Sequence, residues 1–238
     1  MDGPRLLEMR WRDGLFAHWP VDPATIEPTL PERLEVATYD GQAWLGVVPF
    51  VMEDIRPRGS PVGLTFPELN LRTYVEHDGA RGVYFYNLDA DDRLGVRVAR
   101  SLFRLPYYRA EMHVRRGPWP GDPESYPEES IMFTSRRDHE GVPPARFDAT
   151  YRPAGEAFEP EPGSLEAFLV ENYRFYTQGN RLYRGDIEHD PWTLRPAEAE
   201  IRSNTLFAAS SFDRPAGEPR LHYAEPLDVT AGRIRAVE

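Results

Sequence analysis

The segment around residue 70 carries three polar side chains at alternating positions. Glu68, Asn70 and Arg72 are separated by Leu69 and Leu71, and side chains alternate between the two faces of a β-strand. A carboxyl, an amide and a guanidinium would then stand together on one face, where Arg72 could hold a carboxylate through two parallel hydrogen bonds. The same pattern fits a solvated sheet face with one ion pair, and functional carboxylates are the minority. Both interpretations stay open.

A second group of polar residues lies between residues 99 and 110. Tyr107 and Tyr108 could donate hydrogen bonds, and Arg100 and Arg109 could supply positive charge. The segment joins an expected helix to an expected strand, and sites often occur at such junctions because rigid elements hold them. Ordinary aromatic packing at a strand edge explains the same residues equally well.

The histidines do not form a metal-binding pattern. His189 lies between Glu188 and Asp190, and His18 and His222 are distant in sequence. No second histidine stands at a ligand-like spacing such as i+4. A satisfied, partly buried histidine is the commoner explanation of His18, and we predict neither a metal nor a cofactor.

Composition excludes two kinds of covalent chemistry. The 238 residues contain no cysteine and no lysine, and all 28 basic residues are arginine. Lysine Schiff bases, thiol nucleophiles and thiolate zinc sites are therefore excluded. The net charge of −11 and the scattered arginines argue against nucleic acid as a partner. The arginine bias fits either GC-rich coding or adaptation to salt.

The organisation of the chain predicts one domain over residues 1–238. No repeat, linker, signal sequence or membrane-length apolar run is present. We expect a cytoplasmic protein without membrane contact, and a homo-oligomer is compatible with the sequence.

Alternation of apolar residues, turn residues and helix caps predicts mostly strands. Asp-Gly at residues 40–41 indicates a hairpin between strands 34–38 and 42–55, and the second of these is apolar enough to be buried on both faces. Residues 117–129 form a proline-rich loop, interpreted as a lid or an insertion. Helices are expected at 22–30, 89–103 and 164–175, and further strands at 69–75, 83–88, 107–116, 131–135, 146–151, 181–189, 195–201 and 220–223.

Several distinctive sequence blocks run in order through the chain: Phe16-Ala17-His18-Trp19-Pro20-Val21-Asp22-Pro23, Trp44-Leu45-Gly46-Val47-Val48-Pro49-Phe50, Phe66-Pro67-Glu68-Leu69-Asn70-Leu71-Arg72-Thr73-Tyr74, Leu105-Pro106-Tyr107-Tyr108, Pro162-Gly163-Ser164-Leu165-Glu166, Leu182-Tyr183-Arg184-Gly185, His189-Asp190-Pro191-Trp192 and Leu221-His222-Tyr223. These blocks resemble the uncharacterised YqjF-like family, which is similar to the acetoacetate decarboxylase superfamily.

The resemblance implies an α+β, mainly β fold, namely an antiparallel cone-like β-barrel with a few flanking helices and an internal pocket. In the decarboxylases a Gly-Arg-Glu block precedes a Pro-Lys-Lys block, whose first lysine forms the Schiff base. Here the comparable blocks read Ala99-Arg100-Ser101 and Pro106-Tyr107-Tyr108. Tyrosine cannot form an imine, so decarboxylation by that route is excluded.

Together these observations predict binding of a small anionic or carbonyl compound in the pocket. One alternative is a lysine-independent lyase, hydratase or isomerase acting on a small keto or enol compound, with Glu68 as base and Tyr107 or Tyr108 as acid. Another is a structural or interaction protein with a filled barrel. The candidate ligand-binding residues are Glu68, Asn70, Arg72, Arg100, Tyr107, Tyr108 and Arg109.

Overall fold

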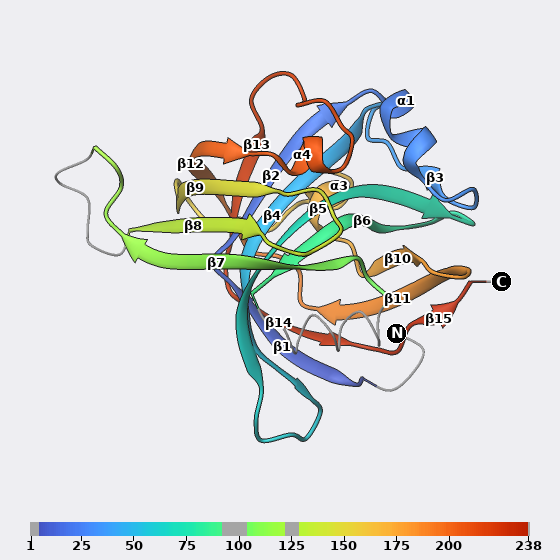
Figure 1. Ribbon diagram of the computed structural model, residues 1–238, viewed down its shortest axis with the longest axis horizontal. Helices are drawn as coiled ribbons and strands as arrows, with labels where there is room; N and C mark the ends of the chain where they lie inside the picture. The colour runs from blue at the N-terminus through green and yellow to red at the C-terminus, as the bar shows by residue number, and fades with distance from the viewer. Residues whose placement is uncertain (1–4, 92–103, 122–128, 238) are drawn as a thin grey trace.

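The structure, a computed structural model, describes residues 5–91, 104–121 and 129–237. Strands dominate these residues, as expected, and the helices are short (Figure 1). The elements are β1 (Leu7–Arg12), β2 (Gly14–Val21), α1 (Pro23–Ile26), the 3-10 helix η1 (Glu27–Thr29), β3 (Glu35–Val36), β4 (Ala43–Pro57), β5 (Leu64–His77), β6 (Ala80–Ala90), β7 (Tyr107–Gly117), β8 (Ser130–Arg137), β9 (Arg146–Pro153), α3 (Leu165–Val170), β10 (Arg174–Gln178), β11 (Leu182–His189), β12 (Leu194–Asn204), α4 (Leu206–Ala209), β13 (Arg220–Ala224), β14 (Leu227–Ala231) and β15 (Arg235–Ala236).

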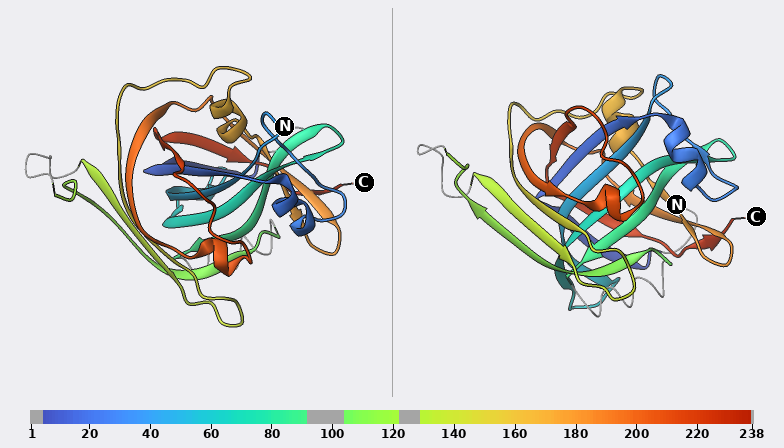
Figure 2. Two further views of the ribbon diagram at one scale, coloured as in Figure 1. Left: turned by 90° about the horizontal axis from the view of Figure 1, so that it is seen from above. Right: turned by 45° about the horizontal axis from the view of Figure 1, so that its top comes forward.

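Strands β4, β5 and β6 form a central wall from which the pairings continue in two directions. One path runs from β6 through β10, β11, β14 and β1 back to β4, and the other runs through β7, β8, β9, β12, β13 and β2 back to β4 (Figures 1 and 2). Strand β6 pairs in parallel with both β7 and β10. The sheet is therefore mixed, and the expectation of a purely antiparallel arrangement is wrong at these two pairings.

The central wall separates two apolar cores. On β4, Trp44, Val48 and Phe50 belong to one cluster of buried side chains, whereas Leu45 and Val47 belong to the other. Alternate side chains of a strand point to opposite faces, so a strand between two cores must be apolar on both. Burial on both faces, predicted for residues 42–55, is confirmed for residues 43–52, whereas residues 42 and 53–55 are only partly buried.

The predicted hairpin has the right turn and the wrong partner. Asp40 and Gly41 both have positive φ angles, of 49° and 76°, and Tyr39 bridges to Gln42. Strand β3, however, pairs with β5 through Glu35–Glu76 and Val36–Val75 rather than with β4. The long β5 offers an unpaired edge beyond β4, and the short β3 fills it.

Two of the predicted helices differ from the structure. Residues 89 and 90, expected to begin a helix, are the last residues of β6, and residues 92–103 lie outside the described part of the chain. The helix expected at 164–175 ends at Val170, because Arg174 already pairs with Asp186 of β11. Its predicted cap is confirmed, since the Ser164 hydroxyl accepts a hydrogen bond from the Ala167 amide.

The helix expected at 22–30 is present as α1 followed by η1, and Asp22 caps it as predicted. In the segment predicted as a lid, Gly117 closes β7, and residues 122–128 lie outside the described residues. Among the residues that the structure describes, no helix is both long enough and apolar enough to cross a membrane.

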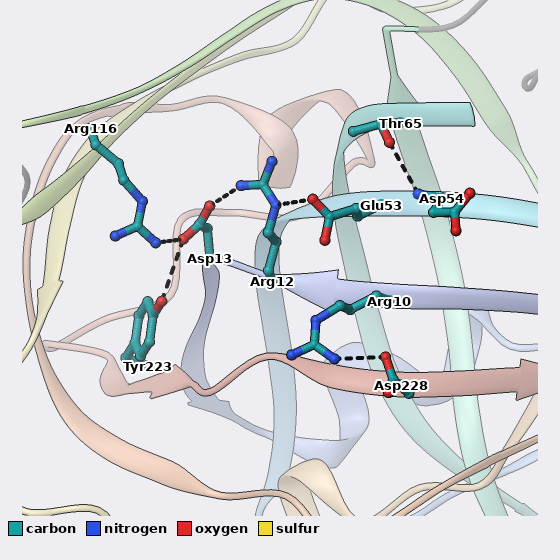
Figure 3. A network of polar contacts seen from close by, with 9 residues as sticks. All are labelled: Arg10, Arg12, Asp13, Glu53, Asp54, Thr65, Arg116, Tyr223 and Asp228. Atoms are coloured by element: carbon teal, nitrogen blue, oxygen red, sulfur yellow. Dashed lines mark hydrogen bonds and ion pairs between the residues drawn. The ribbon is translucent and has the colours of Figure 1, made fainter. Parts of the chain in front are cut away.

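The buried carboxylate of Asp13 links the turn between β1 and β2 to strands β7 and β13 (Figure 3). Asp13 has a φ of 55° and a side chain that is only 2% exposed. Its carboxylate accepts hydrogen bonds from Arg12 and from Arg116 of β7, which approach from opposite sides in Figure 3. The Tyr223 hydroxyl donates to the same carboxylate at 3.5 Å, and the Tyr151 hydroxyl donates to the Asp13 carbonyl at 2.6 Å. Two cations thus compensate one buried anion.

Candidate functional site

A cavity of about 410 Å³ lies on one side of the central wall. Each strand of the circuit β4–β5–β6–β10–β11–β14–β1 contributes side chains to its lining. Most of the lining is apolar, and it includes the aromatic side chains of Trp11, Phe16, Phe50, Phe66, Phe85, Phe175 and Trp192. A concave, mainly apolar site with a few polar groups is the usual form of a small-molecule site.

Four of the predicted polar residues meet at the wall of this cavity. Glu68, Asn70 and Arg72 project from alternate positions of β5, and Tyr107 projects from the start of β7. The pairing register explains the meeting: Asn70 lies opposite Leu88 of β6, which in turn lies opposite Tyr107. Glu68 and Asn70 are each only 3% exposed, so the interpretation of this strand face as solvated is wrong.

The Glu68 carboxyl and the Tyr107 hydroxyl form a buried acid pair. The hydroxyl donates a hydrogen bond to Glu68 Oε2 at 2.7 Å. Burial raises the pKa of Glu68 to about 7, against the opposing effects of the hydrogen bonds from Tyr107 and Asn70 and of the Arg72 charge. Burial and the adjacent Glu68 raise the pKa of Tyr107 well above its usual value. Near neutral pH, Glu68 can take up or release a proton, and Tyr107 remains a neutral donor.

The Arg72 guanidinium has no carboxylate partner among the described residues. Its Nε and Nη2 are buried without a hydrogen-bond acceptor, and its Cζ lies 5.1 Å from the centre of the Phe16 ring. Burial lowers the pKa of Arg72, although Tyr74 and Glu68 oppose this shift. The Oδ1 atom of Asn70 is likewise buried and unpartnered. Unsatisfied buried donors on a cation are costly, and an anionic ligand would satisfy them.

The sequence did not indicate that His18, Tyr74 and Gly46 lie next to Arg72. His18, predicted to be partly buried with its hydrogen bonds satisfied, is completely buried. Its Nε2 shares a hydrogen bond of 2.6 Å with the Tyr74 hydroxyl, whereas its Nδ1 has no partner among the described residues. Burial, Arg72 and His222 hold the pKa of His18 well below its usual range. Gly46 pairs with both His18 and Arg72, and a Cβ at Gly46 would stand 2.8 Å from His18 Cδ2. A glycine inside an apolar strand was the one sequence signal of this close approach.

Tyr108 and Arg109 lie outside the cavity. The Tyr108 ring packs 4.8 Å from the Arg137 guanidinium and 5.5 Å from the ring of His139. The Nε atom of Arg109 donates to Asp138 Oδ1 at 2.8 Å on the surface. Their side chains are used in these contacts, so the expectation that they line one pocket with Tyr107 does not hold. Arg100 lies outside the described residues.

His189 also lines the cavity, but apart from the polar cluster. Its Nδ1 atom lies 2.7 Å from the Asp190 carbonyl, and its ring stacks on Tyr173 with 4.6 Å between ring centres. Burial lowers its pKa. Among residues 5–91, 104–121 and 129–237, no group of three histidine or acidic side chains is arranged to hold a metal ion.

Comparison of the sequence with protein families identifies one family over residues 8–228. It is DUF2071, described as "Uncharacterized conserved protein (COG2071)". The chain belongs to this family. It is also 44% identical over 238 residues to the uncharacterized protein YqjF of Bacillus subtilis (strain 168). The aligned region covers 98% of this chain and 93% of that protein. The resemblance to YqjF-like proteins is confirmed.

Solved structures with the same fold are acetoacetate decarboxylase-like proteins. The enduracididine biosynthesis enzyme MppR, complexed with pyruvate, superposes with a TM-score of 0.65 at 13% identity, over 100% of this chain and 92% of that one. An acetoacetate decarboxylase-like enzyme from Sphingomonas wittichii RW1 gives 0.63 at 15% identity, over 99% and 94%. At these identities the likeness establishes the fold alone: this DUF2071 protein has the mainly β fold of those structures.

Proposed function

We propose that the protein binds a small molecule with a carboxylate or another anionic carbonyl group in the cavity. The observation that carries the proposal is the Arg72 guanidinium at the wall of a mainly apolar cavity, because its buried Nε and Nη2 have no acceptor among the residues that the structure describes. A neighbour of the same fold, MppR, is described in complex with pyruvate, which supports a carboxylate ligand here. The two closed circuits of strand pairings are also what the cone-like barrel of such proteins requires.

Each polar residue would have a separate role. Arg72 would hold the carboxylate through its two unused donors, Nε and Nη2. When Glu68 is protonated, its carboxyl can donate to the Tyr107 oxygen, and the Tyr107 hydroxyl would then donate its single proton to a carbonyl oxygen of the ligand. With no lysine in the chain, the ligand is held without an imine. A filled interior is disfavoured, because about 410 Å³ lies between these groups and the aromatic walls.

Replacing Arg72 with glutamine tests the proposal. We expect Arg72→Gln to weaken binding of a carboxylate ligand by about 10- to 100-fold, because a charged hydrogen-bond pair is replaced by a neutral one. Isothermal titration with a panel of monocarboxylates, pyruvate among them, measures the change. The matched control is Arg109→Gln, which removes an arginine from the surface pair with Asp138 and should leave binding as in the wild type.

Two results would contradict the proposal. One is a panel in which no carboxylate of any size binds the wild-type protein. The other is a bound carboxylate whose affinity is the same in Arg72→Gln, because its charge would then be held elsewhere.

A second candidate function is proton transfer next to a carbonyl group, the step shared by lyases, hydratases and isomerases of keto and enol compounds. The Glu68 pKa of about 7 favours it, because a general acid–base is most effective when its pKa lies near the working pH. The Glu68 carboxylate would take a proton from the carbon beside the carbonyl group. The C–H electron pair would form the enolate. Once Glu68 is protonated it no longer needs the hydrogen bond from Tyr107, so the Tyr107 hydroxyl would donate its proton to the enolate oxygen instead.

Hydrogen–deuterium exchange tests this second candidate. In D₂O we expect the protein to speed the exchange of protons beside the carbonyl group of a bound 2-oxo acid, as followed by NMR. Glu68→Gln should slow this exchange by about 10²- to 10⁴-fold, the usual contribution of a general base. Glu111→Gln, at an exposed glutamate paired with Arg136, is the control. Equal exchange rates in wild type and Glu68→Gln would exclude Glu68 as the base.

A further inference from the structure

We propose that the natural ligand class is a medium-chain carboxylic acid, with its head group at Arg72 and its apolar tail directed along β5 toward the surface. This inference rests on the proposed binding of a carboxylate and adds the chemistry of the remainder of the ligand. It is argued from exposure along β5, from the charges at the two ends of the cavity and from its size.

Exposure changes steadily along β5 and the residues before it. Val62 is 73% exposed, Leu64 36% and Phe66 7%, whereas Glu68 and Asn70 are each 3% exposed. All five line the cavity. The side chains near the surface are apolar and the polar ones lie deep, so the cavity has an apolar mouth and a polar interior end.

The neighbouring strands follow the same order. On β4, Ile55 lies opposite Leu64 at the mouth, and Phe50 lies opposite Glu68 in the interior. On β1, Leu7 pairs with Pro57 of β4 at the mouth end. Three adjacent strands, β1, β4 and β5, thus line one side of the path between mouth and polar end with apolar side chains, which suits an alkyl chain.

The charges fix the direction in which such a ligand would lie. At the mouth, the Arg56 guanidinium is already paired with Asp54 and lies 3.9 Å from Glu8. At the interior end, Nε and Nη2 of Arg72 are unpartnered. An anionic head group therefore gains most at Arg72, and the tail then extends back toward Leu64 and Val62.

The volume also exceeds what a short acid would fill. At about 30 Å³ per molecule in the liquid, 410 Å³ corresponds to roughly a dozen water molecules. A three-carbon acid at Arg72 would leave most of this space to water against aromatic walls. Because apolar cavities hold water poorly, a ligand that fills the cavity with alkyl groups binds more tightly.

A homologous series of straight-chain acids tests the inference on the full chain. Affinities for acetate, butanoate, hexanoate, octanoate and decanoate are measured by isothermal titration below the micelle concentration of each. We expect the dissociation constant to fall about fourfold per added methylene until the tail reaches the mouth. The alcohol 1-decanol, which has the same tail without the charge, should bind more weakly, and Arg72→Gln should weaken decanoate but not 1-decanol.

Substitution along the path checks the direction of the tail. At about 3.3 Å per residue, Val62 lies roughly 30 Å along the chain from Arg72, beyond the reach of a ten-carbon tail. Phe66→Ala should weaken decanoate by about threefold or more and leave butanoate unchanged, because only the longer tail extends past Glu68 toward Phe66. Phe66 is 7% exposed, so thermal unfolding checks that the variant is folded. Val62→Asn, at an exposed valine that the tail does not reach, is the control and should leave both acids unchanged.

The outcomes separate this inference from the proposed function. Affinities that do not change with chain length, with Arg72→Gln still weakening every acid, would overturn the medium-chain ligand and leave carboxylate binding in place. Binding of decanoate that is unaffected by Arg72→Gln would overturn the orientation and the proposed function together. Failure of every acid to bind would do the same.

Discussion

Replacing Arg137 with methionine is expected to lower the free energy of unfolding by about 3–5 kcal/mol, the usual result of removing one partner from a buried ion pair. Arg137 Nε donates to Asp89 Oδ1 at 2.7 Å, and Nη2 donates to Oδ2 at 3.1 Å. The two side chains are 2% and 1% exposed. Burial raises the pKa of Asp89 to about 6 even with Arg137 in place. Without Arg137, a carboxyl group that water cannot reach is left unpaired.

Chemical denaturation at neutral pH measures this loss of stability. Two further variants show whether the loss comes from the unpaired Asp89 carboxyl. The double variant Asp89→Leu/Arg137→Met removes both charges and should recover much of the stability, because an apolar pair in place of a buried ion pair is often close to neutral. Arg136→Met, at the adjacent residue with an exposed pair to Glu111, should change stability little. If Arg137→Met is as stable as Arg136→Met, the Asp89 carboxylate has another partner.

The sequence predicted the face that Glu68, Asn70 and Arg72 share but not the direction in which that face points. Alternation places three side chains together whether they meet water or a cavity. The answer depends on the strands that enclose the cavity opposite β5, among them β1, β10, β11 and β14, which are far from β5 along the chain. The same limit explains β3, whose turn is encoded locally by Asp40 and Gly41 but whose partner, β5, is set by the edge that β4 leaves free.

The pairing register of β7 against β6 determines which of the two tyrosines lines the cavity. Tyr107 and Tyr108 are equivalent in the sequence, and the parallel pairing of Leu88 with Tyr107 directs Tyr107 into the cavity. Tyr108 instead packs on Arg137, whose pairing with Asp89 could not be expected because Asp89 was predicted to cap a helix. The proximity of His18 to Arg72 depends on three strands aligned through Gly46, and no local pattern encodes such an alignment.

The sequence resemblance leads us to expect Tyr107 at the position of the decarboxylase lysine. In this protein a neutral hydroxyl lies 2.7 Å from the Glu68 carboxyl. A cation at that distance would favour the ionised form of Glu68. With a tyrosine, burial outweighs the opposing hydrogen bonds and the Arg72 charge, and the Glu68 pKa is raised to about 7. A tyrosine at this position is therefore compatible with an acid that exchanges protons near neutral pH.

Glu68→Gln should consequently stabilise the protein at high pH. The pKa of Glu68 rises from 4.5 in the unfolded chain to about 7 in the folded protein. Between these values the folded state binds more protons, so stability is greatest below the unfolded pKa and falls as pH rises toward 7. At about 1.4 kcal/mol per pKa unit the loss is on the order of 3 kcal/mol. Glutamine keeps an acceptor for Tyr107 and cannot ionise, so it avoids this loss.

Urea denaturation of wild type and Glu68→Gln between pH 4 and pH 8 measures the effect. We expect similar stabilities at pH 4, where Glu68 is mostly protonated in both the folded and the unfolded state, and a more stable variant at pH 8. Asp89, whose pKa is also raised, remains in both proteins and cancels in the comparison. Glu111→Gln is the control of opposite sign, because its pair with Arg136 lowers the pKa of Glu111. Parallel curves for wild type and Glu68→Gln would mean that Glu68 ionises in the folded protein as readily as in water, and the unpaired Arg72 would then face a permanent negative charge.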